Sequence, residues 1–397
     1  MEEVRCDLHR VQDAPVEGKT VLIRVDYNVP LKDGCIADDA RIRASLPTLT
    51  NLLERGAKLV LLSHLGRPEG RAVPELRLDR ISARLEALLE RPVYKLDDCI
   101  GEEISSRVKQ GESGDVFLLE NVRFHPEETE NDPKFARQLA DLADLFVNEA
   151  FATLHRAHAS TLGVTDFLPS YAGLLIQKEI EALSRLIDNP TRPYIAIVGG
   201  SKAESKIGIL QDLINRVNAV LIGGGVAFTL LRAKGYSVGD SAVDESLLEE
   251  IGALFKKAAE KEVSILLPKD VITARRAEAS AETALFPAEC IPPGWIGLDI
   301  GPETVRQFRT EIDKANTVVW TGPLGAFELP PFSRGTEAIA EALAHSEAFT
   351  VIGGGETGEA VAKTGFAKDI SYISTGGGAC LALLRGKTLP SLDALRK

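Results

Sequence analysis

The sequence of 397 residues contains no cysteine pair spaced C-x-x-C, no apolar run of about 18 residues and no low-complexity linker. Its five cysteines are scattered and odd in number, which argues against a disulfide framework and against a structural zinc site. Without a long apolar run, no membrane-spanning helix is expected. The charged start, Met1–Arg10, lacks the apolar stretch of a signal peptide, so a cytoplasmic protein is expected.

An excess of basic residues is also absent. The chain has 46 Lys and Arg against 58 Asp and Glu, a net charge of −12, which argues against a general nucleic-acid binder. Hydrophobic residues make up 44% and charged residues 26%, and the 34 Gly and 20 Pro are spread along the chain. These values exclude a disordered, collagenous or coiled-coil protein, and the length favours two or three globular domains.

Short apolar runs alternate with amphipathic stretches throughout the chain. The predicted strands are Val21–Val25, Leu59–Leu62, Val116–Leu119, Tyr194–Val198, Ala219–Ile222, Val263–Leu267, Thr317–Trp320 and Phe349–Ile352. The predicted helices include Asp79–Glu90, Lys134–Leu142, Ile207–Val217, Glu245–Ala259 and Thr336–Ala344. Short strands that are apolar on both faces and alternate with helices are typical of parallel sheets covered by helices on both sides.

A domain boundary is predicted near the middle of the chain. Leu174–Ile187 has the pattern of one amphipathic helix, closed by Asp188-Asn189-Pro190, and a new strand follows. The halves share no sequence repeat, but Arg and His follow the strands of the first half, and glycine clusters follow those of the second. We expect two α/β domains with doubly wound parallel sheets, joined by a helix.

Polar residues follow four successive strands of the first half, where open α/β sheets bind ligands. These segments are Asp26–Asn28, Ser63–Pro68, Glu120–His125 and Asn148–Phe151, the last followed by His155–His158; Arg41 and Arg43 open a helix. The planar fork of arginine suits phosphate and carboxylate groups. Any one of these arginines alone is readily explained as a surface residue paired with a glutamate. The whole set predicts a small anionic substrate.

Glycine clusters follow the strands of the second half. They are Gly199-Gly200, Gly223–Gly225, Gly353–Gly355 and Gly376–Gly378. Such turns let backbone N–H groups and a helix N-terminus approach a phosphate, although tight strand-to-helix packing would also explain one or two of them. Lys202 and Lys206 lie four residues apart at the start of a helix, so both can face one ligand. The pattern favours a polyphosphate.

Neither of two familiar nucleotide motifs explains these glycines. No G-x-x-x-x-G-K-[ST] loop occurs, which excludes a Walker-type NTPase. Gly353–Gly358 matches G-x-G-x-x-G after a strand, but Ser374-Thr375-Gly376 stands where a dinucleotide site needs an acidic residue. A nicotinamide-dependent dehydrogenase is therefore a weak alternative.

Taken together, these segments resemble phosphoglycerate kinases over nearly the whole chain. Arg24–Pro30 resembles the family's N-terminal signature, and Ser63–Pro68, Glu120–His125 and His155–Ser160 resemble its phosphoglycerate-binding blocks. The blocks that resemble its nucleotide-binding segments are Gly199–Ile207, Gly223–Gly225, Leu298–Pro302, Val318–Glu328, Gly353–Thr357 and Ser374–Gly378. The resemblance implies a two-lobed, hinge-closing kinase that transfers a phosphoryl group between 1,3-bisphosphoglycerate and ADP with Mg²⁺. It implies domains at 1–172 and 191–376, a joining helix at 173–190, and a final segment, 377–397, that packs back toward the N-terminal domain.

The resemblance also implies the site residues. Those for the phosphoglycerate substrate are Asp26, Tyr27, Asn28, Arg41, His64, Leu65, Gly66, Arg67, Arg123 and Arg156. Those for ATP or ADP are Lys202, Lys206, Gly297, Glu328, Gly354, Gly355, Glu356 and Thr357. Arg41, Lys202 and Gly355 are the implied catalytic residues, which neutralise charge on the moving phosphoryl group. Glu328 is expected to hold the ribose hydroxyls and Glu356 the Mg²⁺.

Several positions depart from the family pattern. Glu356 stands where the family has Asp, Thr321 where it usually has Asn, and Phe228 at another usual Asn position. Glu149 and Ala152 replace the usual Asp and Gly. These changes motivate one alternative, a degenerate member that binds ligands without efficient catalysis. Apart from its small-molecule substrates, we expect no nucleic-acid or membrane partner, and a monomer.

Overall fold

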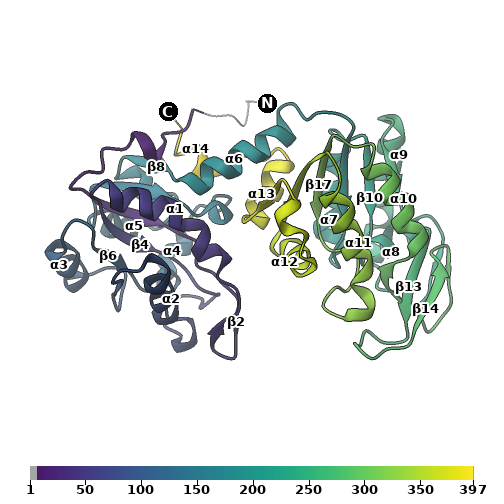
Figure 1. The fold of residues 1–397 in the computed structure, drawn as a ribbon, viewed down its shortest axis with the longest axis horizontal. Helices are drawn as coiled ribbons and strands as arrows, with labels where there is room; N and C mark the ends of the chain where they lie inside the picture. Colours follow the sequence, from purple (N-terminus) through teal and green to yellow (C-terminus); the bar gives the residue numbers. More distant parts are fainter. Residues whose placement is uncertain (1–6, 397) are drawn as a thin grey trace. The chain divides into compact units, whose positions relative to one another are not determined.

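The computed structural model describes residues 7–396, so Cys6, most of the charged start and Lys397 lie outside the described residues. Contacts divide the chain into two compact units (Figure 1). The first contains the chain up to Glu181 together with the segment from Thr388, and the second is Ala182–Lys387. Within residues 7–396, no helix combines the length and the apolar character that crossing a membrane requires.

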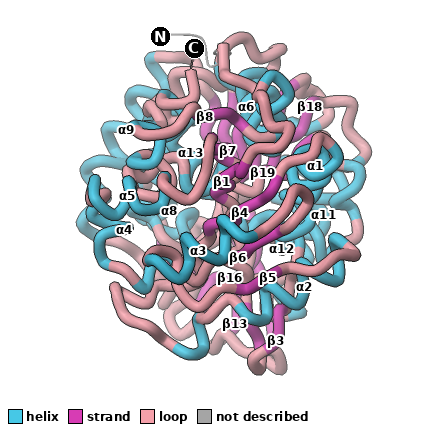
Figure 2. The backbone as a smooth tube through the Cα atoms, turned by 90° about the vertical axis from the view of Figure 1, so that its left-hand side faces the viewer, coloured by secondary structure: helices cyan, strands magenta, loops and turns pink. Residues whose placement is uncertain are grey.

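The first unit is built on a six-stranded parallel sheet with the order β5-β6-β4-β1-β7-β8. Its strands are β1 (Thr20–Arg24), β4 (Lys58–Leu62), β5 (Tyr94–Lys95), β6 (Val116–Leu118), β7 (Leu145–Asn148) and β8 (Ser170–Ala172). In Figure 2 the labels β8, β7, β1, β4, β6 and β5 follow one another in this order. The central strand β1 pairs Val21 with Leu59 of β4 and with Leu145 of β7. The strand order reverses at β1, which makes its carboxyl end a favoured place for a ligand.

Helices cover both faces of this sheet because its strands are apolar on both faces. The helices of this unit are α1 (Ala40–Glu54), α2 (Asp79–Leu89), α3 (Glu102–Gln110), α4 (Pro126–Glu130), α5 (Pro133–Ala140) and α14 (Pro390–Asp393). Helix α6 (Leu174–Ile187) contains the boundary between the two units. Leu49 of α1 and Leu85 of α2 belong to the core on one face, and Val108 of α3 and Leu139 of α5 to the core on the other. A short hairpin, β2 (Leu31–Lys32) and β3 (Cys35–Ile36), precedes α1.

The second unit has its own six-stranded parallel sheet with the order β12-β10-β9-β17-β18-β19. Its strands are β9 (Tyr194–Val198), β10 (Ala219–Ile222), β12 (Ser264–Leu266), β17 (Thr317–Thr321), β18 (Phe349–Gly353) and β19 (Tyr372–Ser374). The strand order reverses between β9 and β17, where Tyr194 pairs with Thr317. The turns after these two strands are therefore the favoured place for a ligand in this unit.

Seven helices and two small sheets complete the described part of the second unit. The helices are α7 (Ala203–Leu213), α8 (Val226–Ala233), α9 (Leu248–Glu260), α10 (Pro302–Ile312), α11 (Arg334–Ala344), α12 (Gly355–Thr364) and α13 (Gly377–Leu384). The small sheets contain β11 (Ser237–Val238), β13 (Asp270–Ala274), β14 (Thr283–Pro287), β15 (Cys290–Ile291) and β16 (Ile296–Ile300). Phe308, Ile339 and Val361 pack with Trp320 in the core between α10–α12 and one face of the sheet.

Each strand predicted from the sequence is present, with its ends within one residue of the prediction. Helix Leu174–Ile187 is confirmed at both ends. The predicted helix Ile207–Val217 is wrong by four residues at each end, because it begins at Ala203 and ends at Leu213. The predicted helix Glu245–Ala259 is split into a 3-10 turn, Glu245–Leu247, and α9.

Candidate active site

A buried arginine organises the carboxyl end of β1. Arg24 is fully buried, and its Nε donates a hydrogen bond to Ser160 Oγ at 2.8 Å. Its Nη2 lies 3.0 Å from Nδ1 of His64, the second residue after β4. Ser160 in turn donates from Oγ to the buried carboxylate of Glu128 at 2.6 Å. Glu128 therefore provides negative charge beneath this arginine.

Asp26 joins the turn after β1 to helix α1. Its carboxylate forms an ion pair with Arg41, near the start of α1, and lies 3.9 Å from Nδ1 of His64. Asp26 is 9% exposed, whereas the side chain of Arg41 keeps 31% of its surface exposed. Arg41 thus reaches solvent from a buried anchor, so its guanidinium is available to a dissolved anion.

Gly66 links three of the predicted substrate residues. Its N–H donates to Asn28 Oδ1 at 2.8 Å, and its carbonyl accepts from Nη1 of Arg123 at 2.9 Å. Nε of Arg123 is buried without a hydrogen-bond partner among the described residues. A buried donor of this kind is costly unless something accepts from it, so Nε of Arg123 is a candidate donor to a bound anion.

Cations dominate the electrostatics of this site. Burial lowers the pKa of His64 well below its usual value, and the guanidinium groups of Arg24, Arg123, Arg156 and Arg41 lower it further. Burial and the neighbouring arginines likewise lower the pKa of Arg123 to about 10 and that of His158 to about 4. The carboxylates that offset these charges at Arg24 and Arg123 are Asp26 and Glu128. The cluster therefore holds an excess of positive charge in a protein of net charge −12.

The other predicted substrate residues have different surroundings. Tyr27 is fully buried, and its hydroxyl lies 3.0 Å from Ser45 Oγ. Leu65 is also buried, and its carbonyl accepts from Asn121 Nδ2 at 2.8 Å. Arg67 is exposed, and the structure gives its side chain no hydrogen bond or ion pair within residues 7–396. Tyr27 and the backbone of Leu65 are therefore held by contacts within the protein, while the side chain of Arg67 remains accessible to a ligand.

In the second unit, the turns after β9 and β17 pack backbone against backbone. The N–H of Gly199 donates to the carbonyl of Thr321 at 2.8 Å, and that of Gly200 donates to Pro323 at 2.7 Å. A Cβ on Gly199 would lie 2.2 Å from the carbonyl oxygen of Pro323, so only glycine fits there. Close backbone packing therefore explains the glycines at 199 and 200. Lys202, which follows this turn, is the N-cap of α7 at the carboxyl end of β9.

Lys206 is the cation around which the nucleotide candidates gather. Its Nζ donates to Thr321 Oγ1 at 3.2 Å, at the position where the family usually has Asn. Burial lowers the pKa of Lys206, and the nearby carboxylate of Glu356 acts in the opposite direction. Lys202, the N-cap of α7, is exposed. The charge of Glu356 on α12 thus acts on Lys206 of α7, although the two helices are far apart in sequence.

The start of α12 is the second part of this group. Gly354 has a φ of +109°, and Gly355 and Glu356 are exposed in the first turn. Thr357 is buried, and its Oγ1 accepts from the N–H of Gly322 at 2.7 Å. The first N–H groups of a helix have no partner within the helix, and its dipole favours negative charge there. The arrangement is suited to phosphate oxygens.

Gly297 and Glu328 lie on other elements. Gly297, on β16, packs against the ring of Phe228, and a Cβ on this glycine would lie 2.1 Å from Phe228 Cζ. The aromatic ring at this unusual position therefore requires a glycine opposite it. Glu328 is exposed in the loop between β17 and α11, and the structure gives its carboxylate no hydrogen bond within the described chain.

Sequence reasoning missed Arg24, Ser160 and Glu128 as functional residues. Arg24 stands at the end of an apolar strand, and a charged residue at a buried strand end is itself a signal. Ser160 and Glu128 give no such signal, because their role depends on contacts with Arg24 and with one another. All three orient the cluster around His64.

Comparisons with known proteins agree over almost the full chain. The family model "Phosphoglycerate kinase" matches residues 11–387. Phosphoglycerate kinase of Pelotomaculum thermopropionicum is 51% identical over 97% of this chain and 98% of its own length. The same enzyme of Gloeothece citriformis is 52% identical over 96% of each chain.

Solved structures give the same result. The structure of phosphoglycerate kinase from Coxiella burnetii matches with a TM-score of 0.86 at 40% identity, and that from Pyrococcus horikoshii with 0.87 at 33%, each covering 98% of both chains. These comparisons give no support to the alternative of a degenerate member. The chain belongs to the phosphoglycerate kinase family and is a phosphotransferase of glycolysis.

Proposed function

We propose that the first unit binds the phosphoglycerate substrate through its arginine cluster and that the second unit binds the adenine nucleotide through its glycine turns and lysines. The observation that carries this assignment is the contact of the buried Arg24 guanidinium with Nδ1 of His64 at 3.0 Å, with the positive charges of Arg41, Arg123 and Arg156 acting on the same imidazole. A substrate with a phosphate and a carboxyl group would supply the missing negative charge. The enzyme then transfers a phosphoryl group between 1,3-bisphosphoglycerate and ADP.

Individual roles in the first unit follow from burial and from unused donors. Arg24 and Asp26 are buried and act as supports, whereas Arg41, Arg67 and Arg156 keep exposed surface and supply guanidinium groups to the ligand. Arg123 is buried, but its Nε has no partner among the described residues, so we assign it to the ligand as well. Arg41 pairs with Asp26, and an anion that takes up this guanidinium must compete with that carboxylate. We assign Arg67, which is exposed, to the end of the substrate that does not react.

In the second unit, the phosphate chain would be held by Lys202, Lys206 and the N–H groups at the start of α12. Lys206 is supported by Thr321, and Lys202 is exposed. We assign the carboxylate of Glu328 to the ribose hydroxyls, because vicinal hydroxyls need an acceptor. Gly297 would approach the base, in a region where Phe228 already packs on it.

Glu356 is the proposed Mg²⁺ ligand. The residues fit the ion: the carboxylate is exposed at the first turn of α12, and a Cβ on Gly355 would meet nothing within 4 Å, so the space beside it is open. Mg²⁺ prefers oxygen ligands and keeps several waters. When bound, it would offset negative charge on the nucleotide phosphates.

Phosphoryl transfer needs placement and charge neutralisation more than a covalent nucleophile. Arg41 would neutralise charge on the phosphoglycerate substrate bound to the first unit, and Lys202 charge on the nucleotide phosphates bound to the second unit. Exclusion of water is a second requirement, because water would compete with the acceptor. We infer a monomer that acts in the cytoplasm; free thiols at Cys35, Cys99 and Cys290 are compatible with a reducing compartment.

The test compares Arg41→Ala with Arg43→Ala. Both arginines lie near the start of α1, but Arg43 pairs with Asp39 and is placed outside the cluster. In a coupled assay with 3-phosphoglycerate, MgATP and a dehydrogenase, Arg41→Ala should lower kcat about 100-fold or more with a smaller change in KM, whereas Arg43→Ala should retain activity. Equal kcat in the parent and Arg41→Ala would show that Arg41 is only a surface residue.

A further inference from the structure

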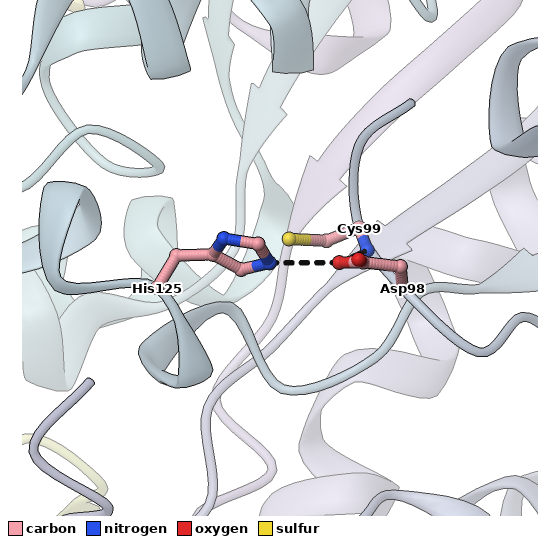
Figure 3. Close-up of side chains that lie close together, drawn as sticks. All are labelled: Asp98, Cys99 and His125. Atoms are coloured by element: carbon pink, nitrogen blue, oxygen red, sulfur yellow. Dashed lines mark hydrogen bonds and ion pairs between the residues drawn. The ribbon is translucent and has the colours of Figure 1, made fainter. Parts of the chain in front are cut away.

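Three side chains with metal-binding atoms meet in the first unit, and none of the three has a role in the proposed active site. Asp98 and Cys99 follow β5 in the connection to α3, and His125 immediately precedes α4 (Figure 3). Figure 3 shows the three side chains pointing toward one another. The resemblance places His125 at the end of a phosphoglycerate-binding block, but the structure pairs it with Asp98 instead.

The geometry of this group is compact. His125 Nε2 lies 2.7 Å from Asp98 Oδ1, and one ligand atom from each residue, including Cys99 Sγ, lies within 4.8 Å of the other two. In a tetrahedral Zn²⁺ site, metal–ligand distances of about 2.0–2.3 Å separate the ligand atoms by roughly 3.3–3.8 Å. Shifts of about 1 Å would therefore bring all three atoms to one cation.

The side chains are also held and accessible in the way that a site requires. The His125 ring packs against Phe135 with ring centroids 5.2 Å apart and an angle of 33° between the ring planes, which restricts its orientation. Cys99 is buried, whereas the side chains of Asp98 and His125 are 51% and 25% exposed. A buried sulfur behind two partly exposed ligands gives an ion an entry path from solvent.

A second carboxylate, that of Glu127, lies near the ring. Glu127 contributes negative charge at His125, and its Oε2 is buried without a hydrogen-bond partner among residues 7–396. A thiolate and the Asp98 carboxylate would balance the two charges of a divalent cation, and Glu127 would add to the attraction.

We propose that Asp98, Cys99 and His125 form a binding site for a borderline-soft divalent cation, Zn²⁺ or Co²⁺, with its remaining position open to water. Sulfur, imidazole nitrogen and carboxylate oxygen together match these ions, whereas Mg²⁺ prefers oxygen alone. Binding releases the thiol proton of Cys99 to solvent and requires Nε2 of His125 to be unprotonated, so that its ring proton resides on Nδ1. The site is therefore separate in chemistry and in place from the Mg²⁺ ligand proposed at Glu356.

The experiment uses Co²⁺ alone as the probe on full-length protein freed of metal with a chelator. A thiolate ligand gives Co²⁺ a near-ultraviolet charge-transfer band, and tetrahedral coordination gives strong visible bands. We expect one equivalent of Co²⁺ to produce both, and one equivalent of Zn²⁺ to abolish them. No thiolate band at a tenfold excess of Co²⁺ would overturn the proposal and leave a hydrogen-bonded trio that serves packing only.

Matched variants identify the ligands. Cys99→Ser should remove the thiolate band, and His125→Gln and Asp98→Asn should weaken Co²⁺ binding by about tenfold or more. Cys290→Ser and His345→Gln, which change exposed residues elsewhere, should bind Co²⁺ as the parent does. Cys99 is buried, so Cys99→Ser can fail to fold. In that case the variants at the partly exposed Asp98 and His125 provide the test. Unchanged Co²⁺ affinity in His125→Gln, or a thiolate band retained in Cys99→Ser, would refute the site.

Discussion

The buried guanidinium of Arg24 contacts Nδ1 of His64 at 3.0 Å, and this contact fixes the proton on the imidazole. Arginine only donates hydrogen bonds, so Nδ1 must accept, and a neutral His64 carries its proton on Nε2. Nε2 is then a donor, which is what an anionic substrate requires. The same arginine disfavours a second proton on the ring.

We therefore expect His64 to remain the neutral Nε2–H tautomer at pH values at which a free imidazole is protonated. Its pKa is lowered well below 6.5, first by burial and then by the arginines. The unfolded chain binds this proton near pH 6.5, so the contribution of His64 to stability falls as the pH drops below that value. Nitrogen-15 NMR of the imidazole measures both tautomer and charge. A ring that titrates at its ordinary pKa would contradict the assignment.

Arg67→Ala should raise the KM for 3-phosphoglycerate about tenfold or more, with a smaller effect on kcat, because we assign Arg67 to the end of the substrate that does not react. Its side chain is exposed and has no hydrogen bond within the described residues, so the free energy of unfolding should change by less than about 0.5 kcal/mol. Steady-state kinetics measures the change in KM and kcat, and urea unfolding measures the change in the free energy of unfolding. Arg71→Ala, a nearby exposed arginine, serves as the control.

Glu149→Gln should make the protein more stable at about pH 8 and less sensitive to pH. Burial raises the pKa of Glu149 to about 8, although its carboxyl group accepts hydrogen bonds from Thr48 Oγ1 at 2.6 Å and from the N–H of Leu175 at the start of α6. The folded state then holds a proton that the unfolded state loses above pH 4.5, so stability falls as the pH rises from 4.5 to about 8, by at most about 1.4 kcal/mol for each pH unit. Urea unfolding at several pH values measures this slope. A slope equal to that of the parent would show that Glu149 does not titrate in this range.

At the proposed metal ligand, we expect Glu356→Ala to raise the Mg²⁺ concentration for half-maximal activity about tenfold or more. Glu356→Asp should keep or raise activity, because the shorter arm needs less ordering to reach Mg²⁺ from the helix start. When Mn²⁺ replaces Mg²⁺, the difference in activity between the parent and Glu356→Asp should be smaller. If Glu356 only stabilises the first turn of α12, Glu356→Ala will lower the melting temperature and leave the Mg²⁺ midpoint unchanged.

The contact between Gly297 and Phe228 predicts a coupled pair of substitutions. Gly297→Ala places a Cβ 2.1 Å from the Phe228 ring, so it should lower the free energy of unfolding by about 1–3 kcal/mol. Phe228→Ala removes the ring, and in that background Gly297→Ala should cost much less. A double-mutant cycle by urea unfolding measures the coupling. Additive effects would mean that the ring moves aside freely.

Most of the fold is predictable from the sequence because its central strands are apolar on both faces and end at glycine or polar residues. β5 and β8 were not predicted, since they are short edge strands, and Tyr94 of β5 is exposed. β14 alternates exposed and half-buried residues on a small sheet, so it too lacks a continuous apolar run. The start of α7 was misplaced because the polar residues from Ala203 to Lys206 show no apolar periodicity.

The site residues that follow strand ends, or that match the family's sequence blocks, could be predicted from the sequence. Asp26 and His64 lie together, as residues after neighbouring parallel strands should, and Arg41 at the start of α1 pairs with Asp26. The network beneath them was not predictable, because Arg24 and Ser160 are separated by 136 positions and no spacing rule connects them. For the same reason, Cys99 and His125 show no metal-binding spacing in the sequence.

The division of the chain has a consequence for its synthesis. The first unit needs residues on both sides of the second, because Thr388 and the residues after it belong with the chain up to Glu181. There the N–H of His9 donates to the carbonyl of Leu395, and the N–H of Ser391 donates to Leu154. During synthesis on the ribosome, the uninterrupted stretch Ala182–Lys387 can complete its folding before the first unit does. The first unit contains the residues translated earliest, but it can complete its structure only after the segment from Thr388 has been synthesised.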